Sequence, residues 1–574
     1  MQCSNIKKLW DRVQDLVNLK ILDLRGSRQL MELPDFSRAH NLEEVYLSKC
    51  ESLHSVHPSI FCLQSLVALY VFYCRKLESL DHGSFPNKLR YLSWEQYPLE
   101  SLPLGFCAEN LVELRMEDSN IKKLWDGVQD LVNLKTLSLP GCKQLVELPN
   151  FSMALNLKTV DLQGCESLHS VHPSILSLQS LVRLDVFNCR KLESLESETH
   201  LKSLSYLSVQ HCLSLEKFCL SSKKLGSLRF RATGVKILHL LSMGGFTELR
   251  ELAIENGKRL RSLPISELCG LTNLRKFELY NFQQVIHTTE LRSLFDAWDD
   301  LEELVLHRCN YLLEIPDNIQ ATTSLKRMFL RDCKRLKSIL GFPPFLQELD
   351  AGGCTSLEIV YADSLVQNQC RFHFDECIKL DERSLQFIEE LTHFSLTLSC
   401  EHPWFCRLSA CYPGIRVPKW IEYKHQTEAS NAIEFICNLE RSPTILCCCV
   451  VPTHLYLPFV RRIYCDFSYD DNNKFRSAVS YFSTAKMELA RVYIWHMDLE
   501  DVSFGAGTGD VAKISCEFYA DYNDGVDFFD GEVETVPMKA CGVHVTYNSQ
   551  SDSGEERLRP TFNPYVLWVR TRWN

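Results

Sequence analysis

The 574-residue chain is 45% hydrophobic and 24% charged, a composition that excludes a disordered protein, and its length allows several domains or a repeat array with a further domain. A net charge of −11 without a long Lys or Arg run argues against nucleic acid as a partner, and no apolar stretch approaches the roughly 18 residues of a membrane span. The 26 cysteines lie mostly inside apolar repeats, so we expect reduced thiols in the cytoplasm or nucleus.

A phrase of the form L-x-x-L-x-L-x-x-C/S recurs along the first 360 residues. Its first leucine opens fifteen successive units, which start at Leu19, Leu42, Leu66, Leu89, Leu111, Leu134, Leu157, Leu181, Leu204, Leu225, Leu249, Leu274, Leu301, Leu325 and Leu346. The spacing of 21 to 27 residues is that of leucine-rich repeats, and it is shorter than ankyrin, TPR or WD40 periods. The sequence therefore predicts an α/β leucine-rich-repeat solenoid, a horseshoe of about 15 repeats, over residues 1–360.

Each unit is expected to supply one short strand. Alternation around L-x-L turns the leucines inward and the intervening residues outward, onto the concave face. The second half of the unit, often L-x-x-L-P as at Leu30–Pro34 and Leu145–Pro149, is expected on the convex side. Proline is tolerated there because the segment has no ladder hydrogen bond to donate.

The ninth position of the unit is cysteine in nine of the fifteen repeats. These residues are Cys50, Cys74, Cys142, Cys165, Cys189, Cys212, Cys309, Cys333 and Cys354. A buried thiol behaves as a small hydrophobe, so we interpret them as core residues and predict neither a metal site nor a cofactor. The sequence has no C-x-x-C pair, and the run Cys447–Cys449 is too short to surround a zinc ion by itself.

Residues 1–80, the first block, recur as residues 116–195, the second block, at an offset of 115, and 58 of the 80 positions are identical. The outward strand positions behave differently, since eight of nine differ in three paired repeats. In the first block these positions are Ile21, Asp23, Arg25, Glu44, Tyr46, Ser48, Ala68, Tyr70 and Phe72, and in the second they are Thr136, Ser138, Pro140, Thr159, Asp161, Gln163, Arg183, Asp185 and Phe187. This pattern favours a surface that meets changing protein partners, although exposed positions without constraint drift in the same way.

Aromatic and Arg side chains dominate the energetics of protein interfaces. On the expected concave face they are Tyr46, Tyr70, Phe72, Tyr91, Arg115, Phe187, Tyr206, Arg229, Tyr280, Phe329 and Arg331. We predict that these eleven residues bind protein; a solvated side chain without a partner is the alternative at each position. Changes at Tyr70, Phe187 or Arg331 are expected to leave folding intact, whereas Leu47→Asp or Leu162→Asp is expected to unfold the array.

The leucine phrase stops after Val360. Residues 361–400 are expected to form a connector with a helix over Asp381–Leu391, and residues 401–550 contain short β-type runs that suggest an antiparallel sandwich. The tail, residues 551–574, is assigned no role. An enzyme site in this region is a further hypothesis, but no spacing of its histidines and cysteines favours it, so we predict no catalytic residue.

Four short motifs in order carry a family resemblance. They are L-P-D-F-S and C-E-S-L in the repeats, P-G-I-R-V-P-K-W at Pro413–Trp420, and K-A-C-G-V-H-V-T-Y at Lys539–Tyr547. With the repeats, they resemble the C-terminal half of plant TIR-NB-LRR disease-resistance proteins (TNL-type NLR proteins of innate immunity) over essentially the whole chain. The resemblance implies an all-β jelly-roll/Ig-like domain (C-JID) over residues 401–550. Its structural residues would be Pro413, Gly414, Pro418, Trp420, Cys541 and Gly542. We expect the Trp420 side chain to pack in the sandwich.

The sequence departs from the family at three places. Ile421 stands where Phe is usual, no Gly occurs in Gln426–Ala432, and Met1 aligns with Met116 inside a repeat. A P-loop, which would hold a nucleotide, is absent, as are TIR and NB-ARC domains. We therefore expect the C-terminal part of a receptor or a truncated product.

The resemblance implies the ligand-sensing part of an intracellular immune receptor in defense and signal transduction. Its partners would be a pathogen effector or a guarded host protein, and the NB-ARC domain in the full-length family. The alternatives are a leucine-rich-repeat adaptor or decoy, or a substrate receptor of a ubiquitin ligase, without signalling of its own.

Overall fold

The computed structural model of the chain describes most of the repeat region and a set of strands after it. The described residues are 2–77, 85–103, 106, 109–240, 245–255, 257–362, 366–367, 370–397, 408–425, 432–438, 443–451, 460–469, 473–480, 490–497, 511–522, 535–536 and 540–547. The tail predicted at 551–574 lies outside them.

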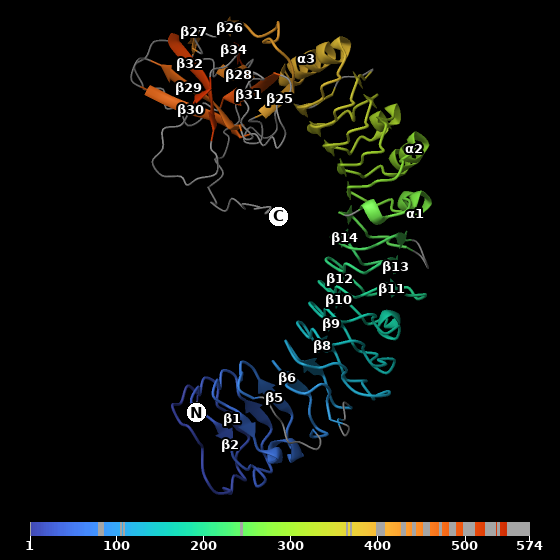
Figure 1. Ribbon diagram of the computed structural model, residues 1–574, viewed down its shortest axis with the longest axis vertical. Helices are drawn as coiled ribbons and strands as arrows, with labels where there is room; N and C mark the ends of the chain where they lie inside the picture. The colour runs from blue at the N-terminus through green and yellow to red at the C-terminus, as the bar shows by residue number, and fades with distance from the viewer. Residues whose placement is uncertain are drawn as a thin grey trace, which may run out of the picture.

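Parallel strands line the inner side of a long arc, as Figure 1 shows. A nine-stranded sheet comes first, with β1 (Ile21–Asp23), β3 (Glu44–Tyr46), β5 (Ala68–Val71), β6 (Tyr91–Trp94), β7 (Glu113–Arg115), β8 (Thr136–Ser138), β9 (Thr159–Asp161), β10 (Arg183–Asp185) and β12 (Tyr206–Ser208). A second sheet continues the arc with β14 (Ser227–Phe230), β16 (Glu251–Ile254), β17 (Lys276–Tyr280), β18 (Glu303–His307), β20 (Arg327–Phe329), β22 (Glu348–Asp350) and β24 (Arg371–His373). Each of the fifteen predicted units has a strand that begins two residues after its first leucine, so the leucine-rich-repeat solenoid is confirmed.

The parallel ladder runs past Val360, where the leucine phrase ends. Strand β24 lies inside the expected connector and pairs with β22 through Phe372 and Leu349. Phe372 and Phe374 are buried, and Cys377 occupies the ninth position. The pattern missed this unit because its first position is Gln369 instead of leucine.

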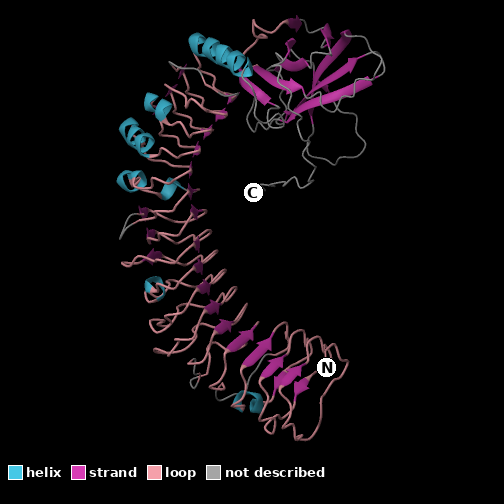
Figure 2. Ribbon diagram, turned by 180° about the vertical axis from the view of Figure 1, so that it is seen from behind, coloured by secondary structure: helices cyan, strands magenta, loops and turns pink. Residues whose placement is uncertain are grey.

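The convex side carries short strands and helices, drawn in Figure 2. The strands form three small parallel sheets: β2 (Glu32–Leu33) with β4 (Ser55–Val56); β11 (Ser194–Glu196), β13 (Lys217–Cys219) and β15 (Ile237–His239); and β19 (Glu314–Ile315), β21 (Ser338–Ile339) and β23 (Ile359–Val360). The helices are η1 (Pro58–Cys62), η2 (Ile175–Ser177), η4 (Gly257–Arg259), α1 (Ile265–Cys269), α2 (Thr288–Ala297), η5 (Asp317–Ala321) and α3 (Glu382–Thr397). None of the described helices is long and apolar enough to cross a bilayer. Helix α3 includes the predicted segment Asp381–Leu391 from its second residue onward.

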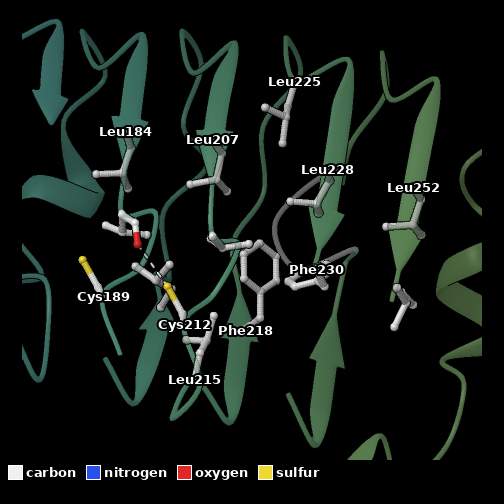
Figure 3. Packing of buried hydrophobic residues seen from close by; sticks show 14 of the residues in the cluster. Leu184, Cys189, Leu207, Cys212, Leu215, Phe218, Leu225, Leu228, Phe230 and Leu252 are labelled. Carbon is white, nitrogen blue, oxygen red and sulfur yellow. Dashed lines mark hydrogen bonds between the residues drawn. The ribbon is translucent and has the colours of Figure 1, made fainter. Parts of the chain in front are cut away.

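The core between the two sides consists of stacked leucines, and the ninth-position thiols lie beside them (Figure 3). Each of the nine predicted thiols is buried and donates a hydrogen bond to a carbonyl oxygen of the preceding repeat. Cys212 Sγ, for example, lies 3.0 Å from the oxygen of Val186, and Cys142 Sγ lies 2.8 Å from that of Met116. These bonds satisfy carbonyl groups that would otherwise be buried without a donor. The cysteines thus help hold neighbouring repeats together.

The strands after residue 408 join the end of the solenoid. Strand β25 (Leu408–Pro413) pairs parallel with β24, and the same sheet continues antiparallel through β31 (Arg491–Met497), β28 (Pro443–Val451), β34 (Ala540–Tyr547) and β26 (Tyr423–His425). A second antiparallel sheet contains β27 (Ala432–Asn438), β32 (Val511–Tyr522), β29 (Val460–Tyr469) and β30 (Asn473–Ser480), with β33 (Thr535–Val536) paired to β32. This β-rich part therefore continues the solenoid sheet.

In the sheet that continues from β25 to β26, alternate residues contact different parts of the protein. Cys448 and Val450 of β28 belong to the same apolar core as the solenoid leucines. Trp495 of β31 instead contacts Phe518 of the second sheet, with 5.9 Å between ring centroids. The run Cys447–Cys449 is fully buried because β28 is covered by apolar side chains on both of its faces.

Candidate protein-binding surface

The outward residues of the parallel strands form rows along the concave face. In the strand register Tyr46 lies opposite Tyr70, Tyr70 opposite Ser93, and Ser93 opposite Arg115. The eleven predicted contact residues all lie on this face, and all are half-buried except Tyr206, which is 40% exposed. The strand leucines between them are buried, as the alternation predicts, whereas Ala68, Ser138 and Asp185, three of the predicted outward positions, are buried too.

Four residues of the first block form a continuous group that we call the aromatic strip: Arg25, Tyr46, Tyr70 and Phe72. The rings of Tyr46 and Tyr70 are stacked, with centroids 4.9 Å apart and planes 6° apart, and Phe72 lies 6.4 Å from Tyr70. The Arg25 guanidinium lies over the Tyr46 ring at 5.0 Å. The guanidinium also pairs with the Asp23 carboxylate at 2.7 Å, so its charge is neutralised within the chain. Stacked rings in neighbouring strands restrain one another, so the strip is a preorganised, mainly apolar surface.

Glu44 fixes the position of Tyr46. The Tyr46 hydroxyl donates a hydrogen bond of 2.7 Å to the Glu44 carboxylate, which lies two residues earlier on the same strand face. This hydrogen bond, together with burial, raises the pKa of Tyr46 to about 12. The phenol therefore stays protonated at neutral pH, and the ring is held in its stacked orientation. Beyond the strip, Tyr91 lies under the Arg90 guanidinium at 5.9 Å.

The second block has a different group at the equivalent strands. The guanidinium of Arg183 lies 3.6 Å from the centre of the Tyr206 ring and 2.8 Å from the Asp185 carboxylate, which is 4% exposed. Phe187 contacts the His211 ring at 5.3 Å. Arg183 and Asp185 were not among the predicted contact residues, although their spacing of two residues places them on one strand face.

Ion pairs between strands occupy the face from β14 onward. Arg229 pairs with Glu251 at 3.0 Å, Lys276 with Glu303 at 2.6 Å, and Arg327 with Glu303 at 2.6 Å. Most of these charges are thus satisfied within the chain. Of the predicted residues, Tyr280 contacts His307 at 5.6 Å and Phe329 lies in the middle row between Val305 and Asp350. Near the N-terminal end of the face, Arg115 pairs with Glu113.

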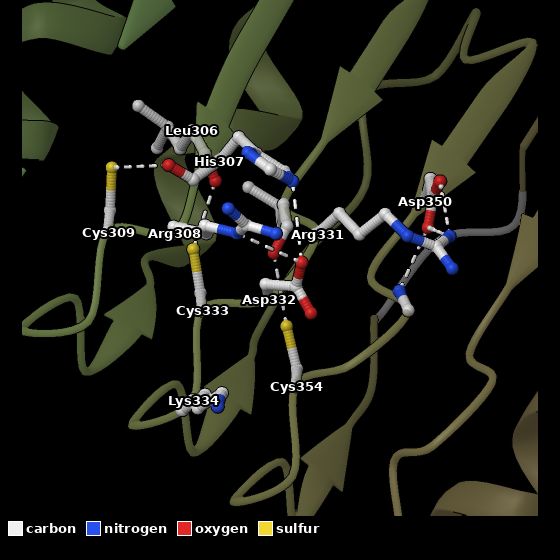
Figure 4. A network of polar contacts seen from close by, with 12 residues as sticks. Leu306, His307, Arg308, Cys309, Arg331, Asp332, Cys333, Lys334, Asp350 and Cys354 are labelled. Carbon is white, nitrogen blue, oxygen red and sulfur yellow. Dashed lines mark hydrogen bonds and ion pairs between the residues drawn. The ribbon is translucent and has the colours of Figure 1, made fainter. Parts of the chain in front are cut away.

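Arg331 takes part in the internal packing of the last repeats. Its guanidinium lies 3.1 Å from the Asp350 carboxylate, drawn in Figure 4, and 3.0 Å from Asp375, whose side chain is fully buried. Next to this pair Arg491 of β31, 2% exposed, contacts Glu376 at 3.1 Å. The expectation that replacing Arg331 leaves folding intact is therefore wrong on the geometry, because Asp375 would lose a cationic partner inside the protein.

The motif residues after the repeats have structural surroundings. Pro413 and Pro418 are buried, and a Cβ atom on Gly414 would come within 2.7 Å of Val492. Trp420 is half-buried, stacks on His393 of α3 at 4.8 Å and packs against the apolar core. It thus lies where the β-rich part meets α3. The buried residue at this point is its neighbour Ile421.

Strand β34 carries the last two motif residues. Cys541 is buried and faces Cys449 in the register, and Gly542 lies opposite Cys448. Among the described residues, no group of three or more His, Cys, Asp or Glu side chains could hold a metal ion.

The chain is similar over part of its length to a known protein family and to proteins of known structure. A family model described as the leucine-rich-repeat domain of the endo-β-N-acetylglucosaminidase EndoS matches residues 108–199. Among solved structures, a leucine-rich-repeat protein of Leptospira interrogans matches 66% of this chain and 95% of that chain, at 17% identity and a TM-score of 0.32.

Curated relatives come from Arabidopsis thaliana. Disease resistance protein RPP4 is 35% identical over 373 residues, which cover 59% of this chain and 31% of that protein. The protein SUPPRESSOR OF npr1-1, CONSTITUTIVE 1 is 32% identical over 628 aligned residues, which cover 96% of this chain and 41% of that protein. The chain thus spans less than half the length of these relatives. The predicted resemblance to plant TIR-NB-LRR disease-resistance proteins is confirmed.

Proposed function

We propose that this leucine-rich-repeat chain, whose relatives are plant disease-resistance proteins, is the ligand-sensing part of an intracellular immune receptor of the cytoplasm or nucleus. It recognises a pathogen effector, or a host protein that an effector alters, and it has no catalytic activity or cofactor of its own. The observation that carries the proposal is the aromatic strip. It offers three neighbouring rings and an arginine on a concave face, the side-chain types that anchor protein interfaces.

The two blocks support recognition of a protein over catalysis. Their buried residues are largely identical, and so are contacts between neighbouring repeats: Ser59 Oγ accepts from the amide of Phe36 at 2.8 Å, and Ser174 Oγ accepts from that of Phe151 at 2.8 Å. The concave groups differ, with stacked tyrosines in one block and an Arg183–Asp185 pair in the other. One scaffold thus presents two different surfaces to a partner.

We also propose that residues 401–550 form a jelly-roll/Ig-like domain that works with the concave face. Two antiparallel sheets packed through Trp495 and Phe518 are what such a sandwich requires. Strand β25 continues the solenoid sheet, so a partner lying along the concave face would reach this domain at the end of the arc (Figure 1).

The proposal is tested by binding. The whole chain would be used to isolate interacting proteins from a panel of pathogen effectors and host proteins, and each candidate would then be titrated against the wild type and against Tyr46→Ala/Tyr70→Ala. Loss of two anchor rings is expected to weaken binding by about 2 kcal/mol or more, a factor of about 30.

Arg231→Ala is the matched control, because Arg231 follows β14 on the same face, pairs with Glu255 at 3.2 Å and is not among the eleven predicted contact residues. Equal affinity of the wild type and the tyrosine variant, with both folded, would contradict the proposed role of the strip. Selective binding of a ubiquitin-ligase scaffold protein would instead favour the adaptor function.

A further inference from the structure

One edge of the solenoid, where the chain turns into strands β8 and β9, exposes apolar side chains in the second block. We call the group the lateral patch: Val128, Val132, Met153 and Leu155, which are 58%, 40%, 47% and 67% exposed. The side-chain amide of Asn156 donates to the carbonyl oxygen of Val132 at 2.8 Å, so the two repeats lie side by side. Single exposed apolar residues are common, but a contiguous group of them marks an interaction site.

The first block shows that the fold does not require two of these apolar residues. Arg38 and His40 stand at the positions of Met153 and Leu155, both exposed, while Ala39 and Ala154 between them are both buried. The other two, Val128 and Val132, correspond to Val13 and Val17, which are exposed valines as well. The second block therefore adds two apolar side chains to a shared pair of valines, at places where the scaffold accepts charged and polar side chains.

Charges around the patch changed as well. In the first block Lys20 pairs with Glu43 at 3.5 Å. In the second block the corresponding residues are Lys135 and Lys158, two exposed cations in neighbouring repeats. Within the described part of the chain, no acidic side chain pairs with either lysine.

Asp130 stands between the patch residues Val128 and Val132. It is exposed, and its carboxylate accepts only a long contact of 3.4 Å from the amide of Val132 among the contacts described for it. The two repeats of the patch thus carry one unneutralised acid and two unneutralised bases.

We propose that the lateral patch is the contact of a two-fold symmetric dimer between two molecules of this chain. Such an interface must be self-complementary, because each surface meets a copy of itself. In this arrangement the two-fold axis passes between Asn133 and Asn156. Asp130 of each molecule then lies opposite Lys158 of the other molecule, and the two Leu155 side chains lie near the axis. The apolar group then loses its contact with water, and each rim charge gains an opposite partner.

The test is sedimentation equilibrium of the whole chain over a micromolar concentration series. The expected result is a concentration-dependent rise toward twice the 66.3 kDa mass of one chain. Met153→Arg/Leu155→His, which restores the first-block residues, should stay monomeric and keep the wild-type melting temperature. Leu313→Arg is the matched control, because it adds a charge at an apolar residue 42% exposed outside the patch, and it should dimerise like the wild type.

Charge reversal tests the two-fold arrangement separately. Asp130→Lys and Lys158→Asp should each weaken dimerisation at least tenfold, and combining them should restore it. A wild-type chain that remains monomeric throughout the series would overturn the proposal. So would a dimer that Met153→Arg/Leu155→His leaves unchanged, since the contact would then lie elsewhere.

Discussion

Replacing Arg331 with alanine removes the guanidinium that lies between Asp350 and Asp375. The Asp375 carboxylate is fully buried, so it cannot regain in water the interaction that it loses, whereas the Arg331 side chain is 31% exposed. Removing one partner of a buried pair costs about 3 to 5 kcal/mol. Since water reaches part of this site, we expect about 3 kcal/mol, the lower end of that range.

Hydrogen exchange measured by mass spectrometry suits a repeat array, because strands open locally. A loss of about 3 kcal/mol should speed exchange in peptides covering β20, β22 and β24 by about 100-fold. Arg229→Ala is the control, since that pair is 41% and 43% exposed and is expected to contribute about 1 kcal/mol or less. Adding Asp375→Asn to Arg331→Ala should recover much of the protection, because the buried carboxylate that lost its Arg331 partner is then removed. Similar exchange in the two single variants would refute the reasoning.

Three further predictions concern the core, the thiols and acid stability. Leu162→Asp places a charge at a residue with 0% exposure and should abolish the cooperative thermal transition measured by circular dichroism, whereas Tyr70→Ala should keep it. Iodoacetamide at pH 8 should label the exposed Cys3 and Cys62 of the native chain and leave Cys142 and Cys212 unmodified. Burial raises the pKa of Cys142 and of Cys212 to about 12, so neither forms the reactive thiolate at this pH. Rapid labelling of Cys142 and Cys212 would contradict their buried packing. A hydrogen bond from His307 lowers the pKa of Asp332, so the carboxylate stabilises the fold above about pH 4, and this stabilisation is lost as the pH falls through the folded pKa. Asp332→Asn should therefore lower the urea midpoint at pH 7, and the difference from the wild type should shrink below pH 4. Equal midpoints at pH 7 would show that the contact does not stabilise the fold.

The repeats could be predicted because each unit encodes its own strand and core contacts. A leucine at the first position and a small residue at the ninth satisfy the same packing in every turn, so the period alone gives the register. The unit containing β24 was missed because Gln369 breaks the pattern while Phe372 and Phe374 still fill the core. Burial requires a suitable volume, which a fixed leucine template does not describe.

The surface could be predicted only in part. Alternation placed Tyr46 and Tyr70 on the concave face, but it could not show that their rings stack or that Glu44 holds one of them. It also could not distinguish Arg331, whose partner Asp375 lies 44 residues away in the sequence, from an arginine available to a ligand. Contacts between repeats depend on side chains a full turn apart, and no local pattern records them.

Concave-face recognition is tested most directly by comparing the binding of one isolated partner protein to the wild type and to Tyr46→Ala/Tyr70→Ala, with the melting temperature of both measured in parallel. The variant is expected to melt within a few degrees of the wild type and to bind about 30-fold more weakly. A variant that binds with wild-type affinity would show that recognition lies elsewhere on the chain and would contradict the proposed role of the concave face.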